Sequence, residues 1–384
     1  MKLKKILLFF AFATAINSLA QIIPTFQNVD YTGNNNIFQK LDIYIPPGLT
    51  APAPVIVFIH GGGWYTGSKG ANNVAYFEPC YNAGFICVDI NYRLTANNDR
   101  WPKQIEDCKA AIRFLKANAS IYGIDKCRFG VMGSSAGGHL SAMMGTTGDV
   151  VALEGAYLGN TTENSRIQAV VDLFGPTDFS LMDGNYSSSC GTGVLVHEQN
   201  SPECALLNIP TLSSNPTLVQ SANPIAYITP DDAKFFIMHG SNDCTVPTNQ
   251  SVILRNALTS GAVTNTYVIA TNQGHGGTWY QDPLRTFQFR DFFLTHLSNP
   301  CSTLALNTNE IKKIKIYPNP ATSEISILIS NNEKFSLEIF NVIGELVLKC
   351  ENQKNISISN FQNGIYIVKV KFENTTITEK IIKY

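Results

Sequence analysis

The sequence predicts an α/β fold with a doubly wound, mostly parallel sheet, followed by a small all-β sandwich. Between Phe26 and Leu297, short apolar runs alternate with helical stretches, which is typical of βα units in a parallel sheet. In residues 311–384 the helical periodicity disappears, and apolar residues alternate with polar ones in strand-like segments. A chain of 384 residues has room for both domains.

The composition indicates a folded chain without a nucleic-acid partner. Hydrophobic residues make up 44% and charged residues 15%, so a large core can form and extensive disorder is excluded. The net charge is −1, and acidic side chains outnumber basic ones in residues 21–310. Because binding to phosphate backbones needs a basic surface, we expect no nucleic-acid partner.

The first element in chain order is a predicted signal peptide, residues 1–20. Lysines precede an apolar run from Ile6 to Ile16, and the small residues of Ser18–Ala20 form a cleavage site. A membrane anchor is the alternative, but the run is shorter than the about 20 apolar residues that span a bilayer. We therefore expect export without stable insertion into a membrane.

The predicted large domain, residues 21–298, contains strands that are rich in Val, Ile and Phe. Runs of this kind are typical of strands buried on both faces of a sheet. The clearest helix is Gln104–Asn118, where apolar residues recur at spacings of three and four. The predicted strands are Leu41–Ile45, Val55–Ile59, Phe85–Ile90, Arg128–Met132, Ala169–Phe174, Phe235–Met238 and Thr266–Ala270.

Residues 178–223 interrupt this alternation with a stretch rich in Ser, Asn, Gly and Pro. A long segment of this kind between two strands predicts an inserted lid over a functional site. A polar linker is expected at 299–310, before the sandwich at 311–384. The sandwich lacks Asp, Arg and His, so we expect it to carry no chemistry. Its predicted strands are Glu324–Ile329, Ser336–Phe340 and Gly364–Val370.

The sequence contains nine cysteines, and some of them are expected to pair in an exported protein. Cys190 and Cys204 flank a Gly/Ser-rich loop, so a disulfide between them is predicted. Cys87 lies inside an apolar strand and is predicted to be a core residue. Neither a C-x-x-C motif nor a Cys/His cluster is present, so no metal site is expected.

The strongest functional signal is the G-x-S-x-G motif centred on Ser135. The strand Arg128–Met132 leads into it and a helical pattern begins at Gly137, which predicts a tight strand–turn–helix connection. This geometry exposes the Ser135 hydroxyl at a helix N-terminus, where developing negative charge is stabilised. Taken alone, the motif has an alternative interpretation, a glycine-rich loop that closes onto a helix.

A glycine run after the strand Val55–Ile59 is predicted to form an oxyanion hole. Backbone N–H groups can point at an oxyanion only where no side chain intervenes. Gly62 and Gly63, together with the N–H of Ala136, are the predicted donors. His60, at the start of the run, is predicted to hold this loop through a side-chain hydrogen bond.

An acid and a histidine are expected downstream, at the ends of later strands. Asp243 follows one apolar strand, and His275 lies in a glycine-rich loop after the next. Asp178, after an earlier strand, is the alternative acid. His139 and His239 are predicted to have packing or turn roles.

Together these residues predict a serine hydrolase that needs no cofactor. His275 would accept the Ser135 proton as the hydroxyl attacks an ester carbonyl, and Asp243 would fix the imidazole tautomer. Water activated by the same histidine would then hydrolyse the acyl-enzyme. Trp64 and Tyr65 are predicted to bind the substrate, which is either a small-molecule ester or a polysaccharide ester.

The large domain resembles the hormone-sensitive-lipase-like α/β-hydrolases, and most closely the Bacteroidetes feruloyl and acetyl-xylan esterase group. The resemblance implies an α/β-hydrolase fold and action on acetyl or feruloyl esters of plant polysaccharide. Ser134 and Gly274 stand where tannase-type feruloyl esterases carry a pair of bridged cysteines. The segments that carry the resemblance are His60–Gly67, Asn91–Leu94, Trp101–Asn118 and Gly133–Leu140.

Residues 311–384 resemble the C-terminal sorting domain of the type IX secretion system. The resemblance implies Sec export to the periplasm, then contact with the type IX machinery, and a secreted or cell-surface protein. A carbohydrate-binding sandwich is the alternative. The matching segments are Ile316–Pro320, Ile339–Asn341, Gly364–Val370 and Lys380–Tyr384.

Other functions stay open on the sequence alone. A broad short-chain carboxylesterase, lipase or polyester hydrolase would use the same residues. The segment His60–Trp64 also resembles arylformamidases, although export disfavours a cytosolic pathway. A non-catalytic adhesion protein on a hydrolase fold is disfavoured because such proteins typically lose the serine or the histidine.

Overall fold

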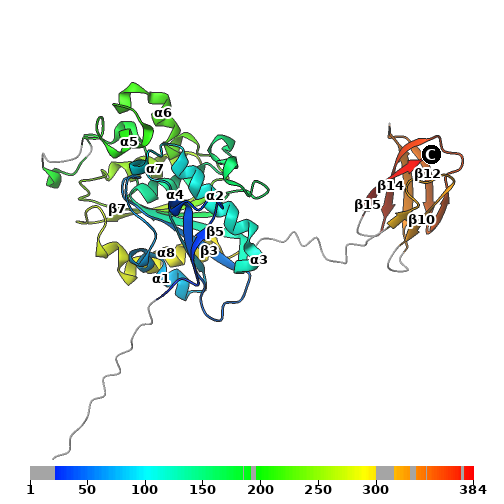
Figure 1. The fold of residues 1–384 in the computed structure, drawn as a ribbon, viewed down its shortest axis with the longest axis horizontal. Helices are drawn as coiled ribbons and strands as arrows, with labels where there is room; N and C mark the ends of the chain where they lie inside the picture. Colours follow the sequence, from blue (N-terminus) through cyan, green and yellow to red (C-terminus); the bar gives the residue numbers. More distant parts are fainter. Residues whose placement is uncertain are drawn as a thin grey trace, which may run out of the picture. The chain divides into compact units, whose positions relative to one another are not determined.

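The computed structural model describes residues 22–184, 186–191, 196–299, 315–328, 334–342, 344–372 and 376–384. The chain divides into two compact units, Met1–Cys301 and Ser302–Tyr384 (Figure 1). The predicted signal peptide and nearly all of the predicted linker lie outside the described residues.

The described residues of the first unit form an eight-stranded sheet with the order β1-β2-β4-β3-β5-β6-β7-β8. The strands from β3 to β8 are parallel, whereas β1 and β2 are antiparallel and form one edge. The sequence missed β1 because its residues are mostly polar and partly exposed. The strands are β1 Phe26–Asp30, β2 Lys40–Tyr44, β3 Ala53–Ile59, β4 Ile86–Ile90, β5 Ile124–Ser134, β6 Ala169–Leu173, β7 Lys234–Gly240 and β8 Asn265–Ala270.

Helices cover both faces of this sheet, as the doubly wound prediction requires. Successive side chains of a strand point to opposite faces, and in β3 Val57 belongs to one buried core while its neighbour Phe58 belongs to the other. The first core includes residues of α2, α4 and α7, and the second includes residues of α1 and α8 (Figure 1). These helices are α1 Val74–Asn82, α2 Lys103–Ala117, α4 Ala136–Thr146, α7 Asn249–Ser260 and α8 Pro283–His296; the short α3 is Ala119–Tyr122.

The predicted insertion, 178–223, is folded rather than structureless in its described part. It contains several 3-10 turns and two short helices, α5 (Pro202–Leu207) and α6 (Pro216–Ser221). Hydrogen bonds anchor it to the domain: the Trp101 N–H donates to the carbonyl of Leu206 over 2.9 Å. The serine and proline residues of this stretch lie at the starts of its helices: Ser201 is the N-cap of α5, and a proline is the first residue of both α5 and α6.

The predicted disulfide between Cys190 and Cys204 is wrong. Cys190 instead bonds Cys244, which lies 54 residues away in the sequence. Cys204 is a free, buried thiol on α5, where it packs with the first core. The prediction failed because nearness along the chain is a poor guide to which side chains meet after folding.

The second unit is the predicted sandwich. Its antiparallel sheets have the orders β13-β10-β9 and β12-β11-β14-β15 and share one apolar core. Strands β9, β12, β13 and β15 were not predicted. The strands are β9 Lys315–Tyr317, β10 Glu324–Leu328, β11 Ser336–Asn341, β12 Leu346–Glu351, β13 Asn355–Ser357, β14 Gly364–Lys371 and β15 Thr376–Lys383. Across the residues described, no helix combines the length and apolar character that a membrane span requires.

Candidate active site

Ser135 lies in the tight turn between β5 and α4. Its φ of +56° is unusual for a residue with a side chain, which indicates backbone strain at this position. The turn also brings α4 against β3: a Cβ added to Gly137 would lie 2.0 Å from the carbonyl oxygen of Ile59. Only glycine fits there, so the G-x-S-x-G pattern reflects a strand–turn–helix connection, as predicted.

His275 lies between Ser135 and Asp243. Its Nε2 is 2.9 Å from the Ser135 Oγ, and its Nδ1 is 2.7 Å from the Asp243 Oδ2. A carboxylate can only accept, so Nδ1 carries a proton and donates it to Asp243. Nε2 is then free to accept the serine proton. The structure thus brings together three residues that are 140 and 32 positions apart in the chain.

The Asp243 carboxylate is buried, with 1% of the residue exposed, and is hydrogen-bonded through both oxygens. Its Oδ1 accepts from the backbone N–H groups of Thr245 at 2.8 Å and Val246 at 2.9 Å. Burial alone would raise the pKa of Asp243, but hydrogen bonds from His239 and His275 outweigh it and hold the pKa well below its usual range. The carboxylate is therefore ionised and fixed in place.

His239 takes part in this network, although the sequence assigned it only a packing or turn role. Its Nε2 lies 2.9 Å from the carbonyl oxygen of Val246 and 3.2 Å from the Asp243 Oδ2. Both are acceptors, so Nε2 carries the proton and Nδ1 accepts from the Ser251 hydroxyl over 2.7 Å. The signal available in the sequence was the spacing of four residues between His239 and Asp243 across a turn.

The predicted oxyanion donors border the same space as Ser135. Gly62 and Gly63 have φ values of +111° and +59°. In the described part of the chain, the N–H groups of Gly62, Gly63 and Ala136 have no hydrogen-bond partner. They are therefore available to bind an oxyanion.

The loop role predicted for His60 is confirmed. Its Nδ1 lies 2.7 Å from the carbonyl oxygen of Gly61, and its ring stacks on Tyr92 with centroids 4.3 Å apart. Burial lowers the pKa of His60 to about 4, so the ring is neutral near pH 7. It therefore supports the glycine loop without adding charge beside the serine.

Asp178, the alternative acid, has a different structural role. Its Oδ1 accepts hydrogen bonds from the Ser180 N–H and hydroxyl and from the Asn223 side chain, and it caps a 3-10 turn of the insertion. It forms no hydrogen bond with His275 among the described residues. The geometry therefore favours Asp243 as the acid.

A cavity of about 450 Å³ opens above Ser135. Trp64, Tyr76 and Phe174 supply much of its apolar lining. The insertion also borders it through His197, Pro202 and Glu203, for which the sequence predicted no contact with substrate. Tyr65, in contrast, is 59% exposed and does not line the cavity, so its predicted contact with substrate has no structural support.

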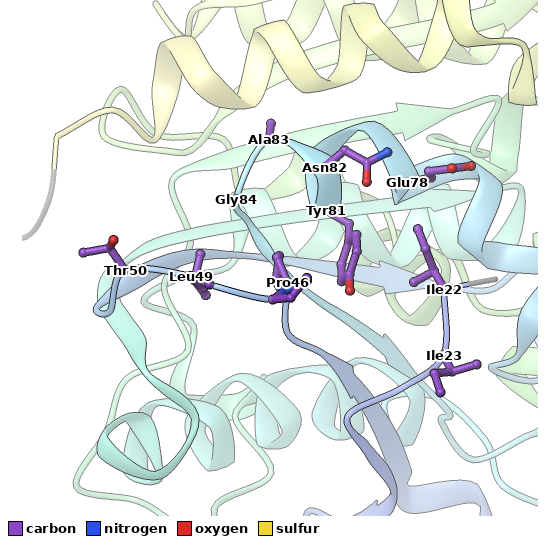
Figure 2. Close-up of a pocket in the computed structure, with 12 residues that line it drawn as sticks. Ile22, Ile23, Pro46, Leu49, Thr50, Glu78, Tyr81, Asn82, Ala83 and Gly84 are labelled. Atoms are coloured by element: carbon purple, nitrogen blue, oxygen red, sulfur yellow. The ribbon is translucent and has the colours of Figure 1, made fainter. Parts of the chain in front are cut away.

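A second hollow, of about 760 Å³, lies elsewhere in the unit (Figure 2). It is lined by the start of the described chain at Ile22, by a proline-containing loop and by the end of α1. Among the described residues that line it, Glu78 and Tyr81 are titratable, and none is a Ser, Cys or His. This composition does not support nucleophilic catalysis.

In the described part of the chain, no three His, Cys, Asp or Glu side chains are grouped as a metal site requires.

The doubly wound sheet and the Ser–His–Asp array at the carboxyl ends of its strands define an α/β-hydrolase. Residues 41–258 match the BD-FAE family model, and the chain belongs to this family. Residues 315–384 match the model of a secretion system C-terminal sorting domain.

Two curated mycobacterial proteins are similar to part of this chain. Esterase LipC of Mycobacterium tuberculosis is 32% identical over 224 residues, which are 56% of this chain and 50% of LipC. LipM of the same organism, a probable carboxylic ester hydrolase, is 33% identical over 215 residues, 55% of this chain and 46% of LipM. The chain thus spans about half the length of the curated relatives it matches.

Solved structures give a similar result. A truncated form of a carbohydrate esterase from gut microbiota has a TM-score of 0.66 and 31% identity, covering 73% of this chain and 99% of that one. A bifunctional GH43-CE protein of Bacteroides eggerthii has a TM-score of 0.63 and 33% identity, covering 71% of this chain and 38% of that one.

Proposed function

We propose that this protein is a secreted serine ester hydrolase that acts through an acyl-enzyme. The observation that carries the proposal is the position of His275, within hydrogen-bonding distance of both Ser135 and Asp243. A hydroxyl paired with a neutral imidazole, and an imidazole paired with a buried carboxylate, are the arrangement that activates serine as a nucleophile.

The mechanism follows from these contacts. The Ser135 oxygen attacks the ester carbonyl while its proton moves to the His275 Nε2. The carbonyl oxygen becomes an oxyanion, which accepts hydrogen bonds from the N–H groups of Gly62, Gly63 and Ala136. His275 then gives the proton to the leaving alcohol, which leaves an acyl group on Ser135. A water molecule then attacks the acyl carbonyl while the same nitrogen takes its proton, and this proton passes to the Ser135 oxygen as the acid is released.

The proposed substrates are acetyl or feruloyl esters of plant polysaccharide. Similarity to a carbohydrate esterase over 99% of its chain supports this class. The second candidate is a broad short-chain carboxylesterase, lipase or polyester hydrolase, which the similarity to the mycobacterial esterases and the apolar lining of the cavity favour. The sorting domain supports secretion, by way of the periplasm and the type IX machinery, to the cell surface or the medium.

The test is ester hydrolysis by the purified full chain and by Ser135→Ala. Wild-type protein should hydrolyse p-nitrophenyl acetate, and the variant should lose activity by at least about a thousandfold, because the nucleophile is removed. Burst kinetics at high enzyme concentration should show one acyl group per Ser135. A variant that retains wild-type activity would refute the proposed function.

A further inference from the structure

Two buried ionisable side chains of the insertion, His197 and Glu203, border the cavity beside Ser135 and have no part in the mechanism above. Each residue is only 2% exposed. Glu203 lies in the first turn of α5, and this turn packs against the oxyanion loop: a Cβ added to Gly63 would lie 3.4 Å from the Cβ of Pro202. The pair therefore faces the space where substrate must bind.

The contacts of His197 indicate that it is positively charged. Its Nδ1 is 2.9 Å from the Glu203 Oε2, and its Nε2 is 3.2 Å from the carbonyl oxygen of Thr245 and 2.8 Å from the Tyr186 hydroxyl. With an acceptor at each nitrogen, the doubly protonated ring satisfies both sides. Burial would lower the pKa of His197, but the bond to Glu203 and the nearby charge of Asp183 raise it above its ordinary value.

This arrangement fixes the Glu203 side chain and leaves one of its carboxylate oxygens available for a ligand. One carboxylate oxygen is bound by His197, while the other accepts no hydrogen bond from any described residue. Among the described residues that line the cavity, Glu203 is the only carboxylate. A buried ion pair is a weak source of stability because desolvation offsets the attraction. The position of the His197–Glu203 pair at the wall of the cavity is therefore better explained by a role in binding a ligand than by a role in stability.

We propose that Glu203 is a substrate-binding residue that accepts hydrogen bonds from sugar hydroxyl groups of the ester, and that His197 holds its carboxylate in position. The inference rests on the proposed function and makes its substrate class more specific. A carboxylate accepts hydrogen bonds and donates none, so it favours neutral, hydroxyl-rich substrates over plain alkyl esters and over anionic ones.

The test compares two esters in wild-type enzyme and in Glu203→Gln, which keeps the shape of the side chain and removes its charge. The ratio of kcat/KM for acetylated xylo-oligosaccharide to kcat/KM for p-nitrophenyl acetate should fall by about tenfold or more, as expected for losing a hydrogen bond to a charged group. Xylobiose, used as a competitive inhibitor of p-nitrophenyl acetate hydrolysis, should bind the variant more weakly by a similar factor.

Glu198→Gln is the matched control, because Glu198 belongs to the same insertion but bonds Ser213 outside the cavity. It should leave both measurements unchanged. Glu203→Asp keeps the charge but shortens the side chain, so it should also lower this ratio of kcat/KM values. It serves as the test variant if Glu203→Gln does not fold. An unchanged ratio and unchanged xylobiose inhibition in folded Glu203 variants would overturn the inference and leave the esterase function intact. Failure of wild-type enzyme to hydrolyse any ester would instead overturn the proposed function, and the inference with it.

Discussion

At the scale of single residues, the Asp243 Oδ2 contacts two histidines of different character. His275 presents its Nδ1 at 2.7 Å and points its other nitrogen at Ser135. His239 is fully buried, and its Nε2, at 3.2 Å, is shared with the carbonyl oxygen of Val246. Two backbone N–H groups fix the other carboxylate oxygen. The acid is therefore held from both sides, and its orientation does not depend on His275.

Replacing this acid should have a large effect on the chemical step. Asp243→Asn should lower kcat by about ten-thousandfold, because an amide can stabilise the wrong tautomer of His275 and cannot balance the imidazolium charge. The measurement is the steady-state rate of p-nitrophenyl acetate hydrolysis, with circular dichroism to establish folding. Asp178→Asn is the control and should change kcat by no more than a few-fold. The opposite pattern, loss with Asp178→Asn only, would assign the acid role to Asp178.

The sequence could predict Ser135, Asp243 and His275 as candidates because each lies at the end of an apolar strand. Parallel strands place these ends at one edge of the sheet, so topology alone brings the residues together. His197 and Glu203 could not be found in this way. They lie in an insertion without periodicity, and the contact of His197 with Thr245 depends on tertiary packing that no local pattern encodes.

At the scale of elements, the insertion and the loop that carries Asp243 are joined at one place by several contacts. Cys190 of the insertion is disulfide-bonded to Cys244, directly after the acid. Thr245, the next residue, donates its N–H to Asp243 and offers its carbonyl oxygen to His197. The segment that borders the cavity is thus tied to the loop that carries Asp243, the hydrogen-bond partner of His275. Because these elements are far apart in sequence, the wrong pairing of Cys190 with Cys204 was the simplest sequence-based guess.

Removing this crosslink should destabilise the first unit. A Cys190→Ser, Cys244→Ser double variant should lose about 2–4 kcal/mol of stability, as is typical when a disulfide that restricts the unfolded chain is removed. It should also raise KM, because the cavity wall is no longer tied to the acid loop. The measurements are denaturant unfolding followed by steady-state kinetics. Cys204→Ser is the control for removing a thiol that is not crosslinked, and it should not reproduce the change in KM. Equal stability of the double variant and wild type would show that the disulfide is dispensable.

At the scale of the whole molecule, every residue assigned to the chemistry belongs to the first unit. The sandwich has its own hydrophobic core, built from residues such as Ile325, Leu337 and Val368. It matches a sorting domain and lacks Asp, Arg and His between 311 and 384. Catalysis and transport are therefore expected to be separable.

Deletion of residues 311–384 tests this separation. In purified enzyme, kcat/KM for p-nitrophenyl acetate should stay within about twofold of the full chain, because each unit has a hydrophobic core of its own and can fold as a separate domain. In cells with a type IX system, the truncated enzyme should accumulate in the periplasm, whereas the full chain reaches the surface or the medium. Full-length Ser135→Ala, followed by antibody, should be exported normally, since sorting does not require activity. Recovery of the truncated enzyme from the medium would contradict the sorting role. Loss of activity in the purified truncated enzyme would instead show that the first unit needs the sandwich for its folding or its catalysis.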